Sequence, residues 1–384
     1  MGTKITSMEY DILLKDGTVI APSEGLNDQV DVAIANGQVA AVSKNIDPQK
    51  AERTISVSGK YVVPGLVDIH AHVYVGVTTW GVAADPACQT TGVTTIVDAG
   101  SSGWATFSGF RNYIVQPTQT RILCYLHISG IGLVYGPVGE MLDLRYADPG
   151  KVADTIIKNR DLIVGVKVRQ GGAQVGDNGV EPLKLAIEAA ERAGVPVMCH
   201  IGAGVSLPEI LKLMRPRDVI THCFQGRGDS ILDEKGRVIP DAWAARQDGV
   251  IFDVGHGGGS FSYDVAKQAM EQGFISDVIS TDLHTGNING PVYNLPTTLS
   301  KFLHLGLSLE EVIEKATIQP AKAIQRDDEI GRLKIGSPAD ITVLDLLDGE
   351  FEFFDTHRKM FVGNQKLEAI FTINQQTITE CVTT

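Results

Sequence analysis

The 384-residue sequence has only five cysteines, an odd number, and no CxxC spacing occurs among them. A disulfide framework is therefore disfavoured, and a protein of the reducing cytoplasm is expected. The first residues also lack the apolar core and the cleavage site of a secretory signal. Both absences point away from an oxidising compartment.

Positive charge is scarce, and long apolar runs are missing. The 33 Lys and Arg residues against 46 Asp and Glu residues give a net charge of −13. Nucleic acids and anionic membrane surfaces favour basic patches, so neither is an expected partner. No apolar run approaches the roughly 20 residues of a membrane span. A small-molecule substrate is expected instead, and a homo-oligomer is compatible with the sequence.

Two catalytic signatures are also missing. No GxSxG stretch occurs, which disfavours a serine esterase of the nucleophile-elbow type. The stretch VGHGGGS fails the GxGxxG pattern because Ser260 stands where the last glycine should be. A dinucleotide site is therefore weakly supported.

Both ends of the chain are rich in short strand-like runs, and the turn signals KDG and ANG separate several of them. The middle of the chain differs, because apolar runs alternate there with amphipathic helical stretches such as 181–194 and 261–273. There are eight such runs: 65–72, 94–100, 121–129, 162–170, 196–202, 218–224, 249–257 and 277–284. This alternation predicts a parallel sheet covered by helices, and eight strands are the number that closes a TIM-like (β/α)8 barrel. An open doubly wound sheet is the alternative, but its glycine-rich fingerprint after the first strand is absent.

Histidines gather at or near the carboxyl ends of these runs, where such barrels place their chemistry. They are His70, His72, His127, His200, His222 and His256, and Lys167 and Asp282 end two further runs. In a strand, residues i and i+2 point to the same face, so His70 and His72 can bind one metal ion. A half-exposed strand with a polar face explains this pair equally well by itself. Imidazole and carboxylate together suit zinc, iron, manganese or cobalt.

Lys167 lies in the middle of a buried pattern, where a protonated amine beside metal ions would be repelled. One interpretation is a lysine that extends to solvent. The other is a desolvated neutral amine that has reacted with carbon dioxide to form a carbamate, an anion able to bridge two metals.

Together these positions resemble the amidohydrolase superfamily, in its binuclear branch with a carboxylated lysine. The likeness extends to YVVPGLVDIHAH at the first strand and to GSPADITVLD near the end of the chain. It implies a barrel domain of residues 64–330 and a small β-sandwich domain composed of residues 1–63 and 331–384. It also implies two divalent metal ions, with zinc as the expected metal.

The resemblance also assigns ligands. It implies that His70, His72 and Asp282 bind the more buried metal, and that His200 and His222 bind the other. The Lys167 carbamate and a hydroxide would bridge the two ions, and Asp282 would pass the proton of the hydroxide to the leaving group.

Within this branch, GVKVRQ and VGHGGGSFS are similar to deacetylases that are often labelled dihydroorotases. Dihydroorotases carry an arginine two residues after the second histidine, and here Tyr74 occupies that position. The expected activity is hydrolysis of an amide or ester bond, acetyl by resemblance, in a small carboxylate-bearing substrate. A cyclic amidohydrolase like dihydroorotase or hydantoinase is one alternative. A mononuclear deaminase, which would not need Lys167, is another.

Four further residues are candidates for contact with the substrate. Arg169 lies on the same strand face as Lys167 and could hold a carboxylate or stabilise an oxyanion. His127 and His284 suit either direct contact or support of the ligands. His256, before a glycine-rich loop, suits either substrate contact or a structural turn.

Overall fold

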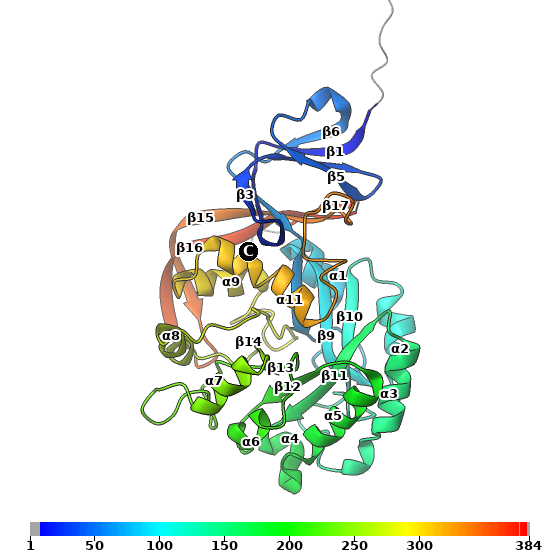
Figure 1. Ribbon diagram of the computed structural model, residues 1–384, viewed down its shortest axis with the longest axis vertical. Coiled ribbons are helices and arrows are strands. Elements are labelled where there is room, and N and C mark those ends of the chain that lie inside the picture. The colour runs from blue at the N-terminus through cyan, green and yellow to red at the C-terminus, as the bar shows by residue number, and fades with distance from the viewer. Residues whose placement is uncertain (1–7, 376, 382–384) are drawn as a thin grey trace, which may run out of the picture.

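Figure 1 shows a computed structural model of the chain, which describes residues 8–375 and 377–381. Residues 1–7, 376 and 382–384, which belong to the predicted small domain, lie outside the described residues. The prediction about a secretory signal also falls partly on residues 1–7. Within the described residues, the strands form three sheets.

A parallel sheet of consecutive strands forms the core of the larger domain and has the order β14-β13-β12-β11-β10-β9-β8. Its strands are β8 (Leu66–Ala71), β9 (Val93–Gly103), β10 (Arg121–His127), β11 (Ile163–Gln170), β12 (Val197–Ile201), β13 (Val219–Thr221) and β14 (Ile251–Asp253). Every residue of β8, β9 and β11 is buried, as expected for strands that are covered on both faces. Seven of the eight predicted runs therefore form strands.

The eighth run, residues 277–284, is the exception, because it forms only isolated bridges. Val278 pairs with Asp253 at the end of β14, and Leu283 pairs with Ala71 at the end of β8. The run thus connects the two edges of the curled sheet and closes the barrel. The predicted TIM-like barrel is confirmed, with its last strand irregular.

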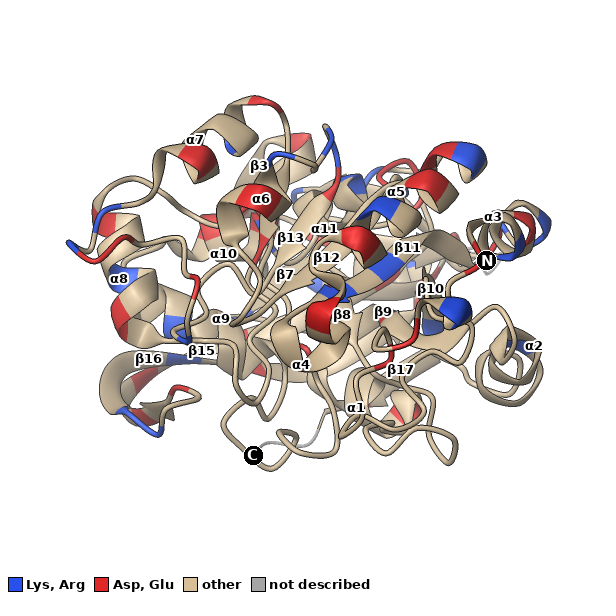
Figure 2. Cartoon of the chain, turned by 90° about the horizontal axis from the view of Figure 1, so that it is seen from below, with Lys and Arg blue, Asp and Glu red and all other residues tan. Residues whose placement is uncertain are grey.

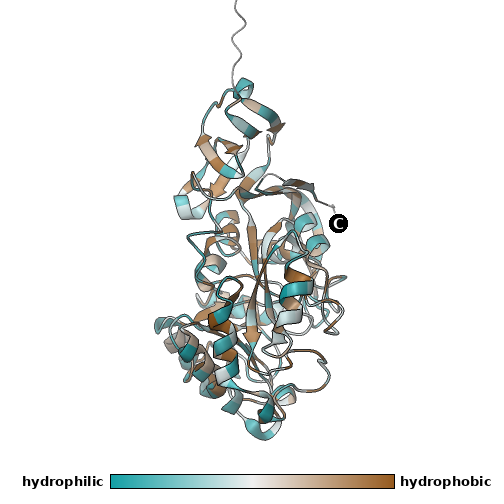
Figure 3. Ribbon diagram, turned by 90° about the vertical axis from the view of Figure 1, so that its right-hand side faces the viewer, coloured by the Kyte–Doolittle hydropathy of each residue, from teal (hydrophilic) through white to brown (hydrophobic). Residues whose placement is uncertain are grey.

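Helices cover the outside of this sheet. They are α1 (Ala84–Cys88), α2 (Phe107–Phe110), α3 (Pro149–Lys158), α4 (Gly172–Val175), α5 (Glu181–Ala193), α6 (Leu207–Leu211), α7 (Pro240–Gln247), α8 (Tyr263–Glu271), α9 (Leu295–His304), α10 (Leu309–Glu314) and α11 (Ile318–Ala323). Helix α5 shows why they pack there: Leu183, Ala186 and Ala190 are buried at helical spacing, and Gly194 ends the helix in a left-handed conformation. The apolar strands and the mixed helices are visible in Figure 3.

Two further sheets form the small domain. The first has the order β5-β4-β1-β6 and contains β1 (Tyr10–Lys15), β4 (Asp31–Ala35), β5 (Gln38–Ser43) and β6 (Ala51–Ser56). The second has the order β17-β16-β15-β7-β2-β3 and contains β2 (Thr18–Ala21), β3 (Leu26–Gln29), β7 (Tyr61–Pro64), β15 (Asp340–Phe354), β16 (Met360–Asn374) and β17 (Thr377–Glu380). One apolar cluster includes Ile12 and Val32 from the beginning of the chain and Ile341, Val343 and Ile373 from its end. Both ends of the chain therefore contribute to a single small core.

The long β15–β16 hairpin extends beyond this core and runs along the barrel (Figure 1). Its far end packs on α8 and α9, where the Tyr263 and Phe361 rings stack with centroids 4.2 Å apart. The carboxylate of Asp355 also accepts a hydrogen bond from the Tyr263 amide. The hairpin tip consequently lies on the barrel domain, although the exact domain boundaries remain a prediction.

Acidic and basic residues lie mainly on the outer helices and loops, including α3, α5 and α8 (Figure 2). In the described part of the chain, none of the helices has both the length and the apolar character required to cross a bilayer.

Candidate metal centre

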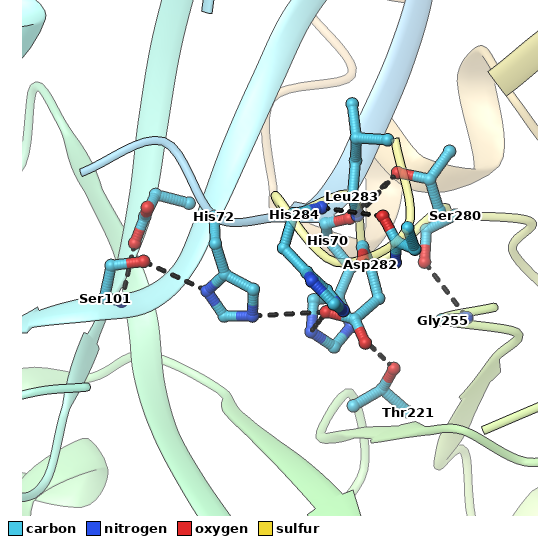
Figure 4. Close-up of polar contacts among 12 residues, drawn as sticks. His70, His72, Ser101, Thr221, Gly255, Ser280, Asp282, Leu283 and His284 are labelled. Atoms are coloured by element: carbon cyan, nitrogen blue, oxygen red, sulfur yellow. Dashed lines mark hydrogen bonds and ion pairs between the residues drawn. The ribbon is translucent and has the colours of Figure 1, made fainter. Parts of the chain in front are cut away.

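The two histidines of β8 lie at the carboxyl end of the barrel, side by side and almost fully buried. The Ser101 hydroxyl lies 3.0 Å from Nδ1 of His72, and the Thr221 hydroxyl lies 2.8 Å from Nδ1 of His70. These contacts leave both Nε2 atoms to face Asp282, whose Oδ1 is 3.1 Å from His72 and 3.4 Å from His70 (Figure 4). Hydrogen bonds to the outer nitrogen orient imidazole ligands in many metal sites.

His70, His72 and Asp282 have the geometry of a cation site, because one ligand atom of each lies within 4.8 Å of the others. Two imidazoles and a carboxylate are ligands suited to zinc and neighbouring transition metals. The residues present therefore fit a divalent metal ion at this point.

His200 and His222 extend the cluster away from β8. The ring centroid of His222 lies 4.4 Å from that of His200 and 5.1 Å from that of His70. Nδ1 of His222 donates to the Gly255 carbonyl at 2.6 Å, so Nε2 is free to bind a ligand. Burial lowers the pKa of His222 to about 4 and the pKa of His200 well below its usual value, which keeps both rings neutral. Neutral imidazole is the form that binds a metal.

Lys167 lies within β11, in the same cluster, and is 1% exposed. Its Nζ lies 3.2 Å from Nε2 of His70, and among the described residues no carboxylate is within ion-pair distance. Burial lowers the pKa of Lys167 to about 8, against the opposing effect of nearby Asp282. The solvent-directed lysine considered from the sequence is therefore excluded.

Two of these residues adopt an unfavourable backbone conformation. His222 has a φ of 71° and Asp282 a φ of 49°, both in the left-handed region that side-chain-bearing residues rarely occupy. Such strain costs about 1–3 kcal/mol per residue and is concentrated at functional sites. The fold maintains this strain at the same positions where the side chains converge.

Arg169 lies in this region, but its guanidinium already has a partner. Its Nε and Nη2 donate to the two carboxylate oxygens of Glu140 at 2.8 and 2.6 Å. The side chain also lies 5.0 Å over the ring of Trp80. His127 is fully buried behind this pair, with Nε2 3.3 Å from Glu140. His127 therefore supports the ion pair, and only Nη1 of Arg169 remains without a hydrogen bond in the described residues.

Both ring nitrogens of His256 already have hydrogen-bond partners. Its Nδ1 donates to the Gly257 carbonyl at 3.0 Å, and its Nε2 accepts a hydrogen bond from Lys301 at 2.7 Å. The ring stacks on Phe261 and has no exposed surface. Lys301 donates further to the carbonyls of Pro291 and Phe354. The geometry favours the structural-turn interpretation of His256 over contact with a substrate.

His284 is the remaining candidate, and it is only partly buried. Its Nδ1 accepts a hydrogen bond from the Gly286 amide at 3.0 Å, while its Nε2 has no partner in the described residues. The ring lies beside those of His72 and Trp80, with centroids 6.4 and 6.0 Å away. The His284 ring therefore lies beside the metal-binding cluster.

Sequence reasoning missed three residues of this region: Trp80, Glu140 and Lys301. Trp80 and Glu140 lie in loops without a periodic pattern. Lys301 lies in an amphipathic helix, where a lysine is ordinarily solvated. No local signal in the sequence indicated any of them.

Comparison with known proteins shows the family of the chain. The model of the amidohydrolase family matches residues 262–382. A deacetylase of Agrobacterium fabrum (strain C58) is 37% identical over 356 residues, which cover 92% of this chain and 87% of the relative. A crystal structure described as an adenine deaminase has a TM-score of 0.91 at 34% identity, over 97% of this chain and 100% of that one. A second, described as a dihydroorotase, has a TM-score of 0.90 at 35% identity, over 96% and 99%. The chain therefore belongs to the amidohydrolase family of hydrolytic enzymes.

Proposed function

We propose that this protein is a metal-dependent hydrolase that removes an acyl group, acetyl foremost, from a small carboxylate-bearing ester or amide. The observation that carries the proposal is the convergence of four imidazoles, the Asp282 carboxylate and a buried amine on one point of the barrel. A relative that is 37% identical over 92% of the chain is named a deacetylase, which supports the acetyl preference.

The proposed ligands form two sets. His70, His72 and Asp282 would hold one divalent cation, and His200 and His222 would hold a second. The low pKa of Lys167 supplies the neutral amine that reacts with carbon dioxide. The resulting carbamate oxygens would join the two sets, and zinc is the metal that we expect.

Such cations would acidify the attacking water and polarise the substrate carbonyl. The protein residues position and move the proton. Asp282, whose Oδ1 lies between the two β8 histidines, would accept a proton from the water and return it to the departing oxygen or nitrogen. The half-buried ring of His284 lies beside Trp80, where its open Nε2 can donate to or accept from the substrate. Trp80 would exclude water from the bond that is cleaved.

Tyr74 argues against the alternative of a dihydroorotase. Its hydroxyl donates to the Thr106 carbonyl at 2.9 Å, and its ring packs on Phe110, so the side chain is 4% exposed. It cannot hold a substrate carboxylate in the way expected of an arginine at this position. A mononuclear deaminase would leave the buried Lys167 amine without a function, so that alternative is also less favoured.

A panel of rates tests the proposal. Metal-loaded enzyme should hydrolyse N-acetyl and O-acetyl acids of one configuration faster than dihydroorotate, and it should release no ammonia from adenine. Hydrolysis of dihydroorotate, or deamination of adenine, at a rate above every acetylated compound would contradict the proposal.

We also propose the cytoplasm as the compartment. All five cysteines are free, and four of them are buried in the fold. A small-molecule substrate and no nucleic acid or membrane partner are the associations that we propose, given the net charge of −13.

A further inference from the structure

The proposed substrate carries a carboxylate, but the residue expected to hold it is already paired. Glu140 binds Nε and Nη2 of Arg169 in a bidentate arrangement, and the Arg169 side chain is only 7% exposed. An incoming carboxylate would find one free nitrogen and a neighbouring negative charge. Another cationic surface near the metal centre is therefore needed for this role.

A cavity of about 400 Å³ lies between the glycine-rich loop after β14 and the tip of the β15–β16 hairpin. Gly258 and Gly286 line it and also contact His284: a Cβ built on Gly258 would lie 3.6 Å from the His284 ring, and one on Gly286 would lie 2.9 Å from it. A Cβ on the preceding Gly257 would lie 2.5 Å from Oδ2 of Asp282. The glycine-rich loop thus borders the cavity at Gly258 and approaches Asp282 and His284 at its neighbouring residues.

One unpaired arginine lines this cavity, and a second lies against the adjoining glycine-rich loop. Arg358 lines it from the hairpin tip, and it is exposed and forms no ion pair or side-chain hydrogen bond within the described residues. Arg227, also exposed and without such a partner there, has Nη1 3.6 Å from the Cβ position of Gly259 in the glycine-rich loop. The residues that precede the two arginines are in contact, because a Cβ on Gly226 would lie 2.8 Å from the His357 ring.

The loop itself offers donors. In the described residues, the amide nitrogens of Gly258, Gly259 and Ser260 have no hydrogen-bond acceptor. Successive free amides of this kind can bind an anion. The one acidic side chain that lines the cavity, Asp355, is already bonded: its oxygens accept from the amides of Tyr263, His357 and Lys359.

We propose that this cavity is the subsite for the anionic end of the substrate, with Arg358 and Arg227 as specificity-determining residues and the loop amides as further donors. The inference deepens the proposed function and rests on it. It assigns to the substrate an acyl group at the metal centre and a carboxylate on the leaving group, directed past His284 toward the hairpin tip. Arg169 then has the role of positioning Trp80 and closing the opposite side of the site.

Kinetics test the assignment with a matched pair of substrates, an N-acetyl amino acid and its neutral primary amide. Arg358→Ala and Arg227→Ala should each lower kcat/KM for the acid by about tenfold or more through KM, because each removes a charge-assisted hydrogen bond. The kcat/KM for the neutral amide should change less than about twofold. Arg358→Lys should recover part of the loss. Arg53→Ala, an exposed arginine on β6 of the small domain, is the control and should change neither value.

A binding measurement separates this inference from the proposed function. Titration calorimetry would measure the affinity for the free amino acid, in its carboxylate form. Wild-type enzyme and the Arg227→Ala/Arg358→Ala variant would be compared at equal metal content. The affinity of the variant should fall by about tenfold or more, whether or not the chosen ester or amide is hydrolysed. Equal affinities, or equal loss for acid and amide in the kinetic experiment, would overturn the inference. Failure to hydrolyse any acyl compound, with the binding difference intact, would overturn only the proposed function.

Discussion

Replacing Glu140 with alanine would leave the guanidinium of Arg169 buried without its counter-ion. The pair is bidentate, with N···O distances of 2.8 and 2.6 Å, and the two side chains are 3% and 7% exposed. Removal of one partner from such a buried pair costs about 3–5 kcal/mol, mainly because the remaining charge is desolvated and unpaired. We expect the Glu140→Ala variant to lose about this much free energy of unfolding.

The assay is urea unfolding at saturating metal, with the midpoint compared at constant slope. The Glu140→Ala/Arg169→Met variant should recover most of the loss, since neither charge is then buried alone. Asp143 and Arg145 provide a matched control, because Nε and Nη2 of Arg145 donate to the two carboxylate oxygens of Asp143 at the surface, where the Arg145 side chain is 91% exposed. Asp143→Asn should have a much smaller effect than Glu140→Ala.

The dependence on pH gives a second readout. Burial alone would raise the pKa of Glu140, but hydrogen bonds from Arg169 and His127 outweigh it and hold this pKa well below its usual value. Because the pKa of Glu140 is lower in the folded state, its carboxylate stabilises the protein at pH values above the unfolded-state pKa of about 4.5. This contribution is lost as the pH falls from there through the folded-state pKa. The difference in free energy of unfolding between wild type and the Glu140→Gln variant should therefore become smaller below about pH 4.5. A loss under about 1 kcal/mol for Glu140→Ala at pH 7, with no recovery in the double variant, would refute this reasoning.

Three further predictions concern the metal centre. Lys167→Ala should reduce the bound metal from two ions to one or none, as elemental analysis would show; two retained ions would exclude the bridging role. Trp80→Ala should lower kcat/KM at unchanged metal content, because water enters beside His284; unaltered kinetics would exclude Trp80 from the site. Gly257→Ala and Gly273→Ala should both lose about 1 kcal/mol of stability, since both glycines have positive φ. Only Gly257→Ala should also lose activity, because its Cβ collides with Asp282 while that of Gly273 meets nothing within 4 Å; equal activity in both would contradict this.

Much of the barrel could be predicted from the sequence, because each buried strand is one continuous apolar run with a polar residue at its end. Seven of these runs form strands within a few residues of the expected bounds. The eighth run was harder, because 277–284 is held mainly by isolated bridges and by the carboxylate of Asp68, which accepts from the Thr281 amide. Such side-chain contacts leave no periodic signal.

The partners of the site residues could not be predicted, for a related reason. Arg169 lies two residues after Lys167 on the same strand, so its place on the same face could be predicted. Glu140, however, reaches it from a loop 29 residues earlier. Lys301 has the spacing of an ordinary helical lysine, and its burial arises only because the hairpin end at Phe354 covers it. Both depend on contacts between distant segments, which local patterns do not encode.

The most direct test of the central claim is a metal titration of activity. Metal-free protein in bicarbonate buffer would receive increasing zinc while hydrolysis of an acetylated amino acid is followed. Activity should rise until two equivalents are bound per chain, and the Lys167→Ala variant should lack this end point. Full activity at one equivalent, or no hydrolysis at any zinc concentration, would contradict a binuclear hydrolase.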